Sequence, residues 1–163
     1  MSRRLTVAAC IAALGATGGA ALASKRFDGT VIGVTDGDTL TVLVVRTPVR
    51  VRLAEINAPE NGQEFGERSR QALANLCMRQ WATVHVIGTD HYGWTVGRVQ
   101  CRGQDASTDQ VRYGMAWVSD RYATDDSLNQ LQQDARDARI GLWRHPNPIP
   151  PWRWRRPNTI QVH

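Results

Sequence analysis

A small domain that is mainly β with helices (α+β) is predicted by three observations. Short runs rich in Val and Thr alternate between apolar and polar residues and are separated by turn residues, which is typical of β-strands. Other segments repeat their apolar residues at spacings of three and four, which is typical of amphipathic helices. The chain has 163 residues and no visible internal repeat, so it has the length of one domain with a real core.

Residues 1–23 have the pattern of a secretory signal peptide and are left out of the fold prediction. Arg3 and Arg4 precede an apolar run, and Ala21-Leu22-Ala23 forms a small-residue cleavage site. Glycines interrupt the apolar run before it reaches the ~20 residues that a membrane span needs. We therefore expect a mature chain from residue 24 that is periplasmic or secreted, with no membrane attachment once the signal peptide is removed.

Five strands are predicted in the first two thirds of the chain. An antiparallel meander is expected first, with turns at Asp36-Gly37 and near Pro48, and a hairpin follows it. The predicted strands are Thr30–Val34, Thr39–Val45, Val49–Glu55, Val84–Ile87 and Thr95–Cys101. Short strands with interposed helices predict a five-stranded OB-fold barrel, the oligonucleotide/oligosaccharide-binding type, closed or partly open.

About three α-helices are predicted around this barrel. Gly66–Arg79 is amphipathic, and Ser107–Tyr113 is a short helix that ends at Gly114. A longer helix, capped by Asp125 or Ser127, is expected before Gly141 because Leu128, Leu131, Ala135 and Ala138 recur at helical spacing. The barrel and these helices make up a predicted domain of residues 24–145.

Residues 146–163 form a tail of different composition, which we predict to be non-helical. Five of the chain's seven prolines lie here, at positions 146, 148, 150, 151 and 157. Within it, Pro150–Arg156 interleaves tryptophan and arginine, a pattern that suits single-stranded nucleic acid. The alternative is an extended strap whose tryptophans cover an apolar patch on the barrel. We favour the strap because exposed tryptophans are unfavourable.

Net charge does not identify a nucleic-acid-binding domain. The chain carries 20 Lys and Arg against 15 Asp and Glu. Six of the arginines lie outside residues 24–143, so the body of the domain is close to neutral and only the tail is plainly basic. These arginines are Arg3, Arg4, Arg144, Arg153, Arg155 and Arg156.

Cys77 and Cys101 are the cysteines that remain after removal of the signal peptide. In an exported chain, two cysteines indicate one disulfide. Cys77 lies beside the apolar stripe of its predicted helix, and strand alternation places Cys101 on the same face as Val99. The alternative is a pair of buried free thiols.

The residues between positions 36 and 60 suit hydrolysis of a phosphodiester. This reaction needs neutralised phosphate oxygens and a positioned water, which a hard cation and arginines supply. Asp38 follows a glycine turn, Asn57 lies five residues after Arg52, and Pro59 orients Glu60. Their oxygens are of the kind that Ca²⁺ prefers. Alternatively, Asp38 alone would be a turn residue, and Arg52 and Glu60 would form a structural ion pair.

The ordered set of motifs resembles the staphylococcal nuclease (thermonuclease) family over residues 26–145. This resemblance implies an OB-fold barrel with three helices and calcium-dependent cleavage of DNA and RNA. The motifs are Asp36-Gly37-Asp38-Thr39, Val51-Arg52-Leu53, Ala58-Pro59-Glu60, Asp90-His91-Tyr92-Gly93 and Ala138-Arg139-Ile140-Gly141-Leu142-Trp143.

The resemblance also implies a role for each residue of the site. Arg52 matches the catalytic arginine on the phosphate, and Glu60 matches the carboxylate that orients or deprotonates the attacking water. The expected calcium ligands are Asp38, Asn57 and Ala58. Tyr92 and Tyr122 match tyrosines that line the nucleotide pocket. Trp94, which has no counterpart in the family pattern, is also an expected substrate-binding residue that stacks a base, with packing as the alternative.

Two departures from the family pattern predict a weaker site. The family has aspartate where this chain has Asn57, which removes one anionic calcium ligand. The family also has arginine where this chain has Trp94, and indole cannot donate a charged fork to phosphate. We therefore expect an attenuated, monomeric nuclease acting on DNA and/or RNA with Ca²⁺. The alternative is a catalytically impaired module on the same fold that binds nucleic acid or another anionic polymer.

Overall fold

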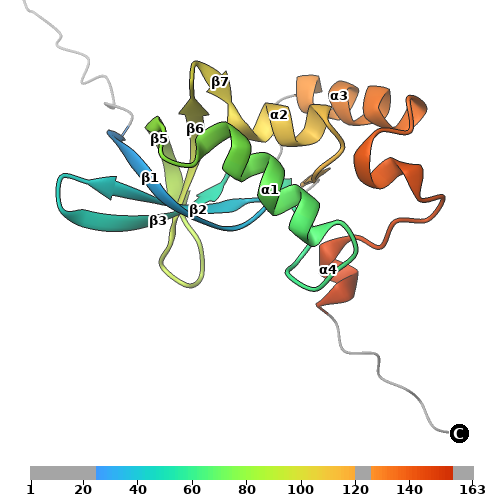
Figure 1. Cartoon of the computed structure of the whole chain (residues 1–163), viewed down its shortest axis with the longest axis horizontal. Coiled ribbons are helices and arrows are strands. Elements are labelled where there is room, and N and C mark those ends of the chain that lie inside the picture. The colour runs from blue at the N-terminus through green and yellow to red at the C-terminus, as the bar shows by residue number, and fades with distance from the viewer. Residues whose placement is uncertain (1–24, 120–125, 156–163) are drawn as a thin grey trace, which may run out of the picture.

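The computed structural model describes residues 25–119 and 126–155, which form a β-barrel with helices at one end (Figure 1). The predicted signal peptide, Asp125, Tyr122 and residues 156–163 lie outside the described residues. No helix among the described residues is long and apolar enough to cross a membrane.

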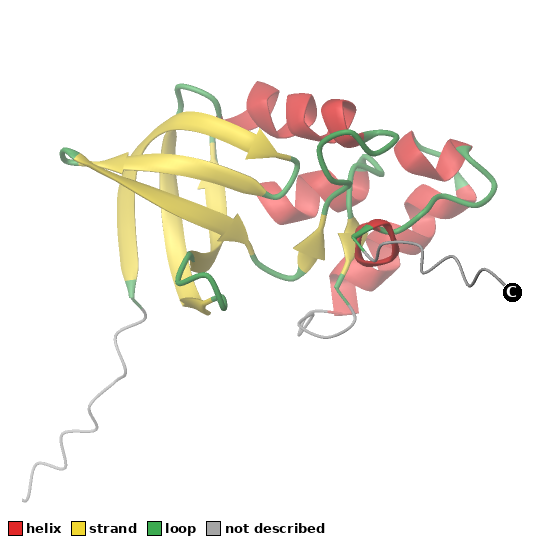
Figure 2. Cartoon of the chain, turned by 90° about the horizontal axis from the view of Figure 1, so that it is seen from below, coloured by secondary structure: helices red, strands yellow, loops and turns green. Residues whose placement is uncertain are grey.

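The barrel consists of five strands that curl until the first sheet edge meets the last (Figure 2). The order is β3-β2-β1-β5-β6 with antiparallel neighbours, and parallel pairing of β3 with β6 closes the barrel. The predicted five-stranded OB-type barrel is therefore confirmed. The strands are β1 (Arg26–Asp36), β2 (Thr39–Val44), β3 (Thr47–Leu53), β5 (Trp81–Thr89) and β6 (Thr95–Cys101).

The three predicted helices are also present, together with shorter elements. The helices are α1 (Gly66–Cys77), α2 (Ala106–Arg112) and α3 (Asp126–Asp137), and a 3₁₀ turn follows at Gly141–Arg144. Two short strands, β4 (Ile56–Asn57) and β8 (Trp117–Val118), pair with each other, and β7 (Gln104–Asp105) extends β6. In both views the helices gather at one end of the barrel (Figures 1 and 2).

The turn predicted near Pro48 is present but lies two residues earlier. The chain turns at Val45 and Arg46, where Val45 has a positive φ of 58°, and Pro48 lies inside β3 opposite Leu43. Pairing of β3 with β6 begins only at Val51, so the other side of Pro48 is a sheet edge. Proline is tolerated there because no ladder hydrogen bond requires its missing N–H.

The prediction that the tail contains no helix is wrong. Pro151–Trp154 forms the short helix α4, with Pro151 in the first turn, where a missing N–H leaves no bond unmade. The strap interpretation is also not borne out, because Trp152 and Trp154 are 40% and 48% exposed and the described contacts of the tail are with the segment before α1 and with Trp117. Gln63 Nε2 donates to the carbonyl of Ile149 at 2.5 Å, and the Trp152 ring meets Trp117 edge-on at 6.2 Å.

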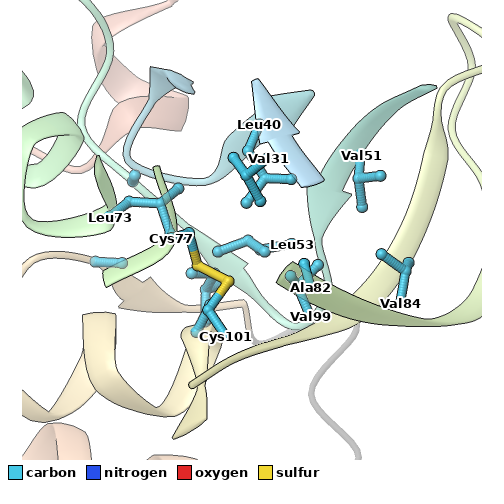
Figure 3. Close-up of a cluster of buried hydrophobic side chains, with 14 of the residues drawn as sticks. Val31, Leu40, Val51, Leu53, Leu73, Cys77, Ala82, Val84, Val99 and Cys101 are labelled. Carbon is cyan, nitrogen blue, oxygen red and sulfur yellow. A yellow bond between two sulfur atoms is a disulfide. The ribbon is translucent and has the colours of Figure 1, made fainter. Parts of the chain in front are cut away.

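The core lies inside the barrel and continues to α1 through a disulfide (Figure 3). Cys77 at the end of α1 is bonded to Cys101 at the end of β6, with 5.3 Å between their Cα atoms. The predicted disulfide is confirmed, and the free-thiol alternative is wrong. In the chain-entropy treatment, closing this loop of 24 residues stabilises the fold by roughly 3.5 kcal/mol. The barrel side chains around it include Val31, Leu40, Leu53, Val84 and Val99.

Candidate active site

The turn between β1 and β2 lies directly against α1, and Gly37 makes this approach possible. A Cβ at Gly37 would lie 1.7 Å from Ser69 Oγ and 2.8 Å from the Cβ of Ala58. Gln110 Nε2, from α2, donates to the Gly37 carbonyl at 2.6 Å and to the Ser69 carbonyl at 3.1 Å. Two helices therefore hold the turn that carries Asp36 and Asp38.

Asp38 is the centre of a buried hydrogen-bond network. Its Oδ2 accepts the Ala58 N–H at 2.8 Å, and its Oδ1 accepts the Thr39 hydroxyl at 3.0 Å. Arg52 Nη2 lies 3.5 Å from Asp38 Oδ2 and donates to Asn57 Oδ1 at 2.8 Å. The fold thus brings together Asp38, Arg52, Asn57 and Ala58, four of the residues that the sequence indicated.

Asp36 belongs to this cluster as well, although it was not among the predicted site residues. Its Oδ1 accepts the N–H of Asp38 at 3.1 Å. Burial and the adjacent negative charge of Asp38 raise the pKa of Asp36 to about 7. The Asp-Gly-Asp spacing could have indicated that Asp36 lies at the site, because a tight turn places the side chains that flank its glycine close together.

The donor set around Asp38 fits a hard cation. Two neighbouring carboxylates repel each other, and a divalent cation between them would relieve that repulsion. The amide oxygen of Asn57 is a neutral oxygen of the kind that Ca²⁺ accepts, whereas Ala58 contacts Asp38 through its N–H. Within residues 25–119 and 126–155, no group of three or more His, Cys, Asp or Glu side chains is placed to bind a metal. A site here would therefore rely on neutral oxygens and water in addition to the two aspartates.

Glu60 lies two residues beyond Ala58 on a tightly folded loop. Its N–H donates to Gln63 Oε1 at 3.0 Å, and the Gln63 N–H donates back to the Glu60 carbonyl at 3.0 Å. A Cβ at Gly66 would lie 2.1 Å from that carbonyl, so only glycine permits this loop to close onto α1. The loop thereby fixes the backbone of Glu60, whose side chain is 34% exposed.

The alternative of a structural ion pair between Arg52 and Glu60 is not observed in the described part of the chain. Arg52 contacts Asp38, as above, and Glu60 Oε1 lies 3.3 Å from Nε of Arg155 in the tail. Arg155 lies in the tryptophan- and arginine-rich segment of the tail, but its position at Glu60 was not predicted from the sequence. Its contact with Glu60 joins segments far apart in the sequence, and no local motif signals it.

Trp94 and Tyr92 lie on the β5–β6 loop, beside β3. Asp90 Oδ1 accepts the N–H groups of both residues at 2.9 Å, which shapes the loop. The two rings lie 5.2 Å apart, and the guanidinium of Arg50 stacks over Trp94 at 4.6 Å. Because Arg50 is two residues from Arg52 on β3, this aromatic cluster flanks the site. Tyr122, the third predicted substrate contact, lies outside the described residues.

Arg98 does not take the place of the arginine that the family resemblance leads one to expect at position 94. Its Nη2 pairs with the buried carboxylate of Glu55, and its Nη1 lies 4.0 Å from Asp105. These contacts hold Arg98 in a structural ion pair on the neighbouring strand.

Comparison with known proteins agrees with this geometry. The family model described as "Staphylococcal nuclease homologue" matches residues 50–145. A protein from Shigella flexneri named micrococcal nuclease is 45% identical over 141 residues, which is 80% of this chain and 81% of that protein. Protein ParB of Escherichia coli is 44% identical over 139 residues, 78% of each chain. An uncharacterized endonuclease of Escherichia coli O157:H7 is 41% identical over 128 residues, 78% of this chain and 84% of that protein.

Proposed function

Because this chain belongs to the staphylococcal nuclease homologue family and is thus a phosphodiester hydrolase, we propose that it is an exported, calcium-dependent nuclease for DNA and/or RNA. The observation that carries the proposal is the cluster of Asp38, Arg52 and Ala58 described above, with Asp36 beside it. It brings together two carboxylates, which would attract a cation, and a guanidinium.

Arg52 binds the scissile phosphate in this proposal. Its described contacts, to Asp38 and Asn57, use Nη2, and a guanidinium has further donors for the phosphate oxygens. The Asp38 and Asn57 contacts hold the planar fork in one orientation before substrate arrives. Such preorganisation lets the arginine stabilise negative charge as it develops on the phosphoryl group.

Glu60 acts on the attacking water. Its carboxylate is partly exposed, so a water can reach it, and the Gln63 and Gly66 contacts fix its backbone. Glu60 accepts a proton from that water as its oxygen attacks phosphorus. The bond to the leaving oxygen breaks, and this oxygen keeps the electron pair and takes a proton from solvent water. A bound Ca²⁺ would supply charge neutralisation to the phosphate oxygens.

We further propose that the site is attenuated. Asn57 contributes a neutral oxygen that is already accepting from Arg52, and Trp94 places an indole where the family resemblance implies a guanidinium. A second candidate function, binding without cleavage, is favoured by the stack of Tyr92, Trp94 and Arg50, which offers aromatic faces and a cation to a single strand. Intact Glu60 and Arg52 favour the enzyme.

Export is supported by the signal-peptide pattern and by the Cys77–Cys101 disulfide, since such bonds persist in oxidising compartments. We propose that the mature chain is a periplasmic or secreted monomer that is not attached to the membrane.

The test is cleavage of a short single-stranded oligodeoxynucleotide by disulfide-intact protein with Ca²⁺ or with EDTA. We expect cutting only with Ca²⁺, and a large loss in Glu60→Gln and in Arg52→Lys, which keeps the charge but not the fork. Glu64→Gln, on the same loop, and Arg46→Ala, in the β2–β3 turn, are matched controls because both residues are exposed. Cleavage in EDTA would remove the metal from the proposal. Parental rates in both site variants would place the active site elsewhere.

A further inference from the structure

The tail places an arginine on the carboxylate proposed to activate water. Nε of Arg155 lies 3.3 Å from Oε1 of Glu60, and α4 lies beside the loop that precedes α1 (Figure 1). We propose that Arg155 is a second arginine of the active site: its Nε orients Glu60, and its terminal nitrogens bind the substrate phosphate. This inference depends on the proposed nuclease function, which it deepens.

The position of Arg155 is fixed by contacts at both ends of α4. Gln63, which is buried, hydrogen-bonds the backbone of Glu60 through Oε1 and donates to the Ile149 carbonyl through Nε2. One side chain therefore ties the tail to the Glu60 loop. The N–H of Arg155 donates to the Pro151 carbonyl at 3.0 Å, and Pro151 is itself buried. Arg155 thus extends from an anchored turn.

The contacts of Arg155 leave its fork available for a ligand. Nε donates to the Pro151 carbonyl at 3.4 Å and is the nitrogen nearest to the Glu60 carboxylate, 3.3 Å from Oε1. Among the described residues, none accepts a hydrogen bond from Nη1 or Nη2, and the side chain is 44% exposed. A planar guanidinium fork matches two oxygens of a phosphate. If Arg155 instead blocked Glu60, its Nη1 and Nη2 would be expected to hydrogen-bond the Glu60 carboxylate, and that carboxylate would be buried.

The other arginines near the site are committed to different partners. Arg50 stacks on Trp94, and Arg98 pairs with Glu55 and Asp105. Arg52 is held by Asp38 and Asn57 on the cation side of the site. Of the arginines in residues 25–119 and 126–155, Arg155 is the one in an ion pair with Glu60. It therefore brings a second positive charge to the side of the phosphate where water would attack.

The experiment compares Arg155→Ala, Arg155→Lys and the control Arg153→Ala in single-turnover cleavage of the oligodeoxynucleotide at saturating Ca²⁺. Arg153 is an exposed residue of the same helix. We expect the Arg155→Ala rate constant to fall about 10²-fold, as for loss of one preorganised donor. Arg155→Lys should retain an intermediate rate because charge remains without the fork. Arg153→Ala should match the parent.

Chemical rescue distinguishes this role from a structural one. Millimolar guanidinium should raise the Arg155→Ala rate and leave the parent rate unchanged, whereas a lost packing contact would not be restored. A parental rate in Arg155→Ala, with Glu60→Gln still inactive, would overturn the inference but keep the proposed function. A faster Arg155→Ala would show that the tail inhibits the site and would overturn it equally. A parent that cuts nothing with Ca²⁺ would overturn the proposed function and the inference together.

Discussion

Replacement of Gly37 by alanine should both destabilise the fold and disable the site. The new Cβ would lie 1.7 Å from Ser69 Oγ and 2.8 Å from the Cβ of Ala58. Ser69 cannot easily turn away, because its hydroxyl donates to the Met115 carbonyl at 2.7 Å and accepts from Gln110 at 3.2 Å. The turn must then move away from α1. Overpacking of this kind destabilises by about 1–3 kcal/mol, and we expect the upper half of that range.

The same displacement would separate Asp36 and Asp38 from Ala58 and Arg52. A shift of ~1 Å in a catalytic geometry can lower a rate by about 10²-fold. At about 3–4 °C per kcal/mol for a domain of this size, the melting temperature should fall by roughly 6–12 °C.

Calorimetry of the disulfide-intact, calcium-free protein measures the stability change, and single-turnover cleavage measures the rate. Gly33→Ala is the matched control, because its Cβ would meet nothing nearer than Thr41 Cβ at 3.8 Å. We expect its unfolding free energy to stay within about 0.5 kcal/mol of the parent. If Gly37→Ala melted and cut like Gly33→Ala, the close approach of the turn to α1 would be refuted.

Three further predictions concern other residues. The pKa of Asp36, raised to about 7 by burial and by Asp38, exceeds the ~3.9 of an unfolded aspartate, so the folded state holds the extra proton. In the absence of calcium, the free energy of unfolding should therefore decrease as pH rises from about 4 to 7. Urea denaturation of Asp36→Asn should not show this decrease. An equal dependence of the unfolding free energy on pH in both proteins would contradict the prediction. Reduction of Cys77–Cys101 should lower the unfolding free energy by roughly 3.5 kcal/mol; two alkylatable thiols in unreduced exported protein, seen by intact mass, would show that the bond does not form. Trp94→Arg should raise single-turnover cleavage at saturating Ca²⁺, further with Asn57→Asp; an unchanged or lower rate would assign Trp94 a packing or stacking role.

Local patterns in the sequence were sufficient for the barrel and its helices. Alternation located the strands that form the barrel, and the spacing of Leu128, Leu131 and Ala135 located α3. The Asp38, Arg52 and Asn57 cluster was predictable because the meander pairs β2 with β3 over a short loop, bringing Thr39 opposite Arg52. Inward-facing sulfurs on α1 and β6 likewise predicted the disulfide.

Features that depend on tertiary contacts were missed. Pro48 indicates a turn by composition, but it is accommodated in β3 because the edge beside it is unpaired until Val51. The prolines of the tail suggested extended chain, yet Pro151 starts a helical turn. Arg155 lies at Glu60 in a tail that Gln63 anchors through Ile149, and no periodicity or motif encodes that contact.

The central claim is that one carboxylate-lined cation site, with Arg52 and Glu60, hydrolyses phosphodiesters. The most direct measurement is the calcium dependence of oligodeoxynucleotide cleavage by the disulfide-intact parent, Asp38→Asn and Glu60→Gln proteins at one pH. We predict that the parent cuts with Ca²⁺ and not with EDTA. Asp38→Asn should need much more Ca²⁺ for its remaining activity, because one of two carboxylates is lost. Glu60→Gln should stay slow at every Ca²⁺ concentration. Equal calcium dependence and equal rates in all three proteins would contradict the account.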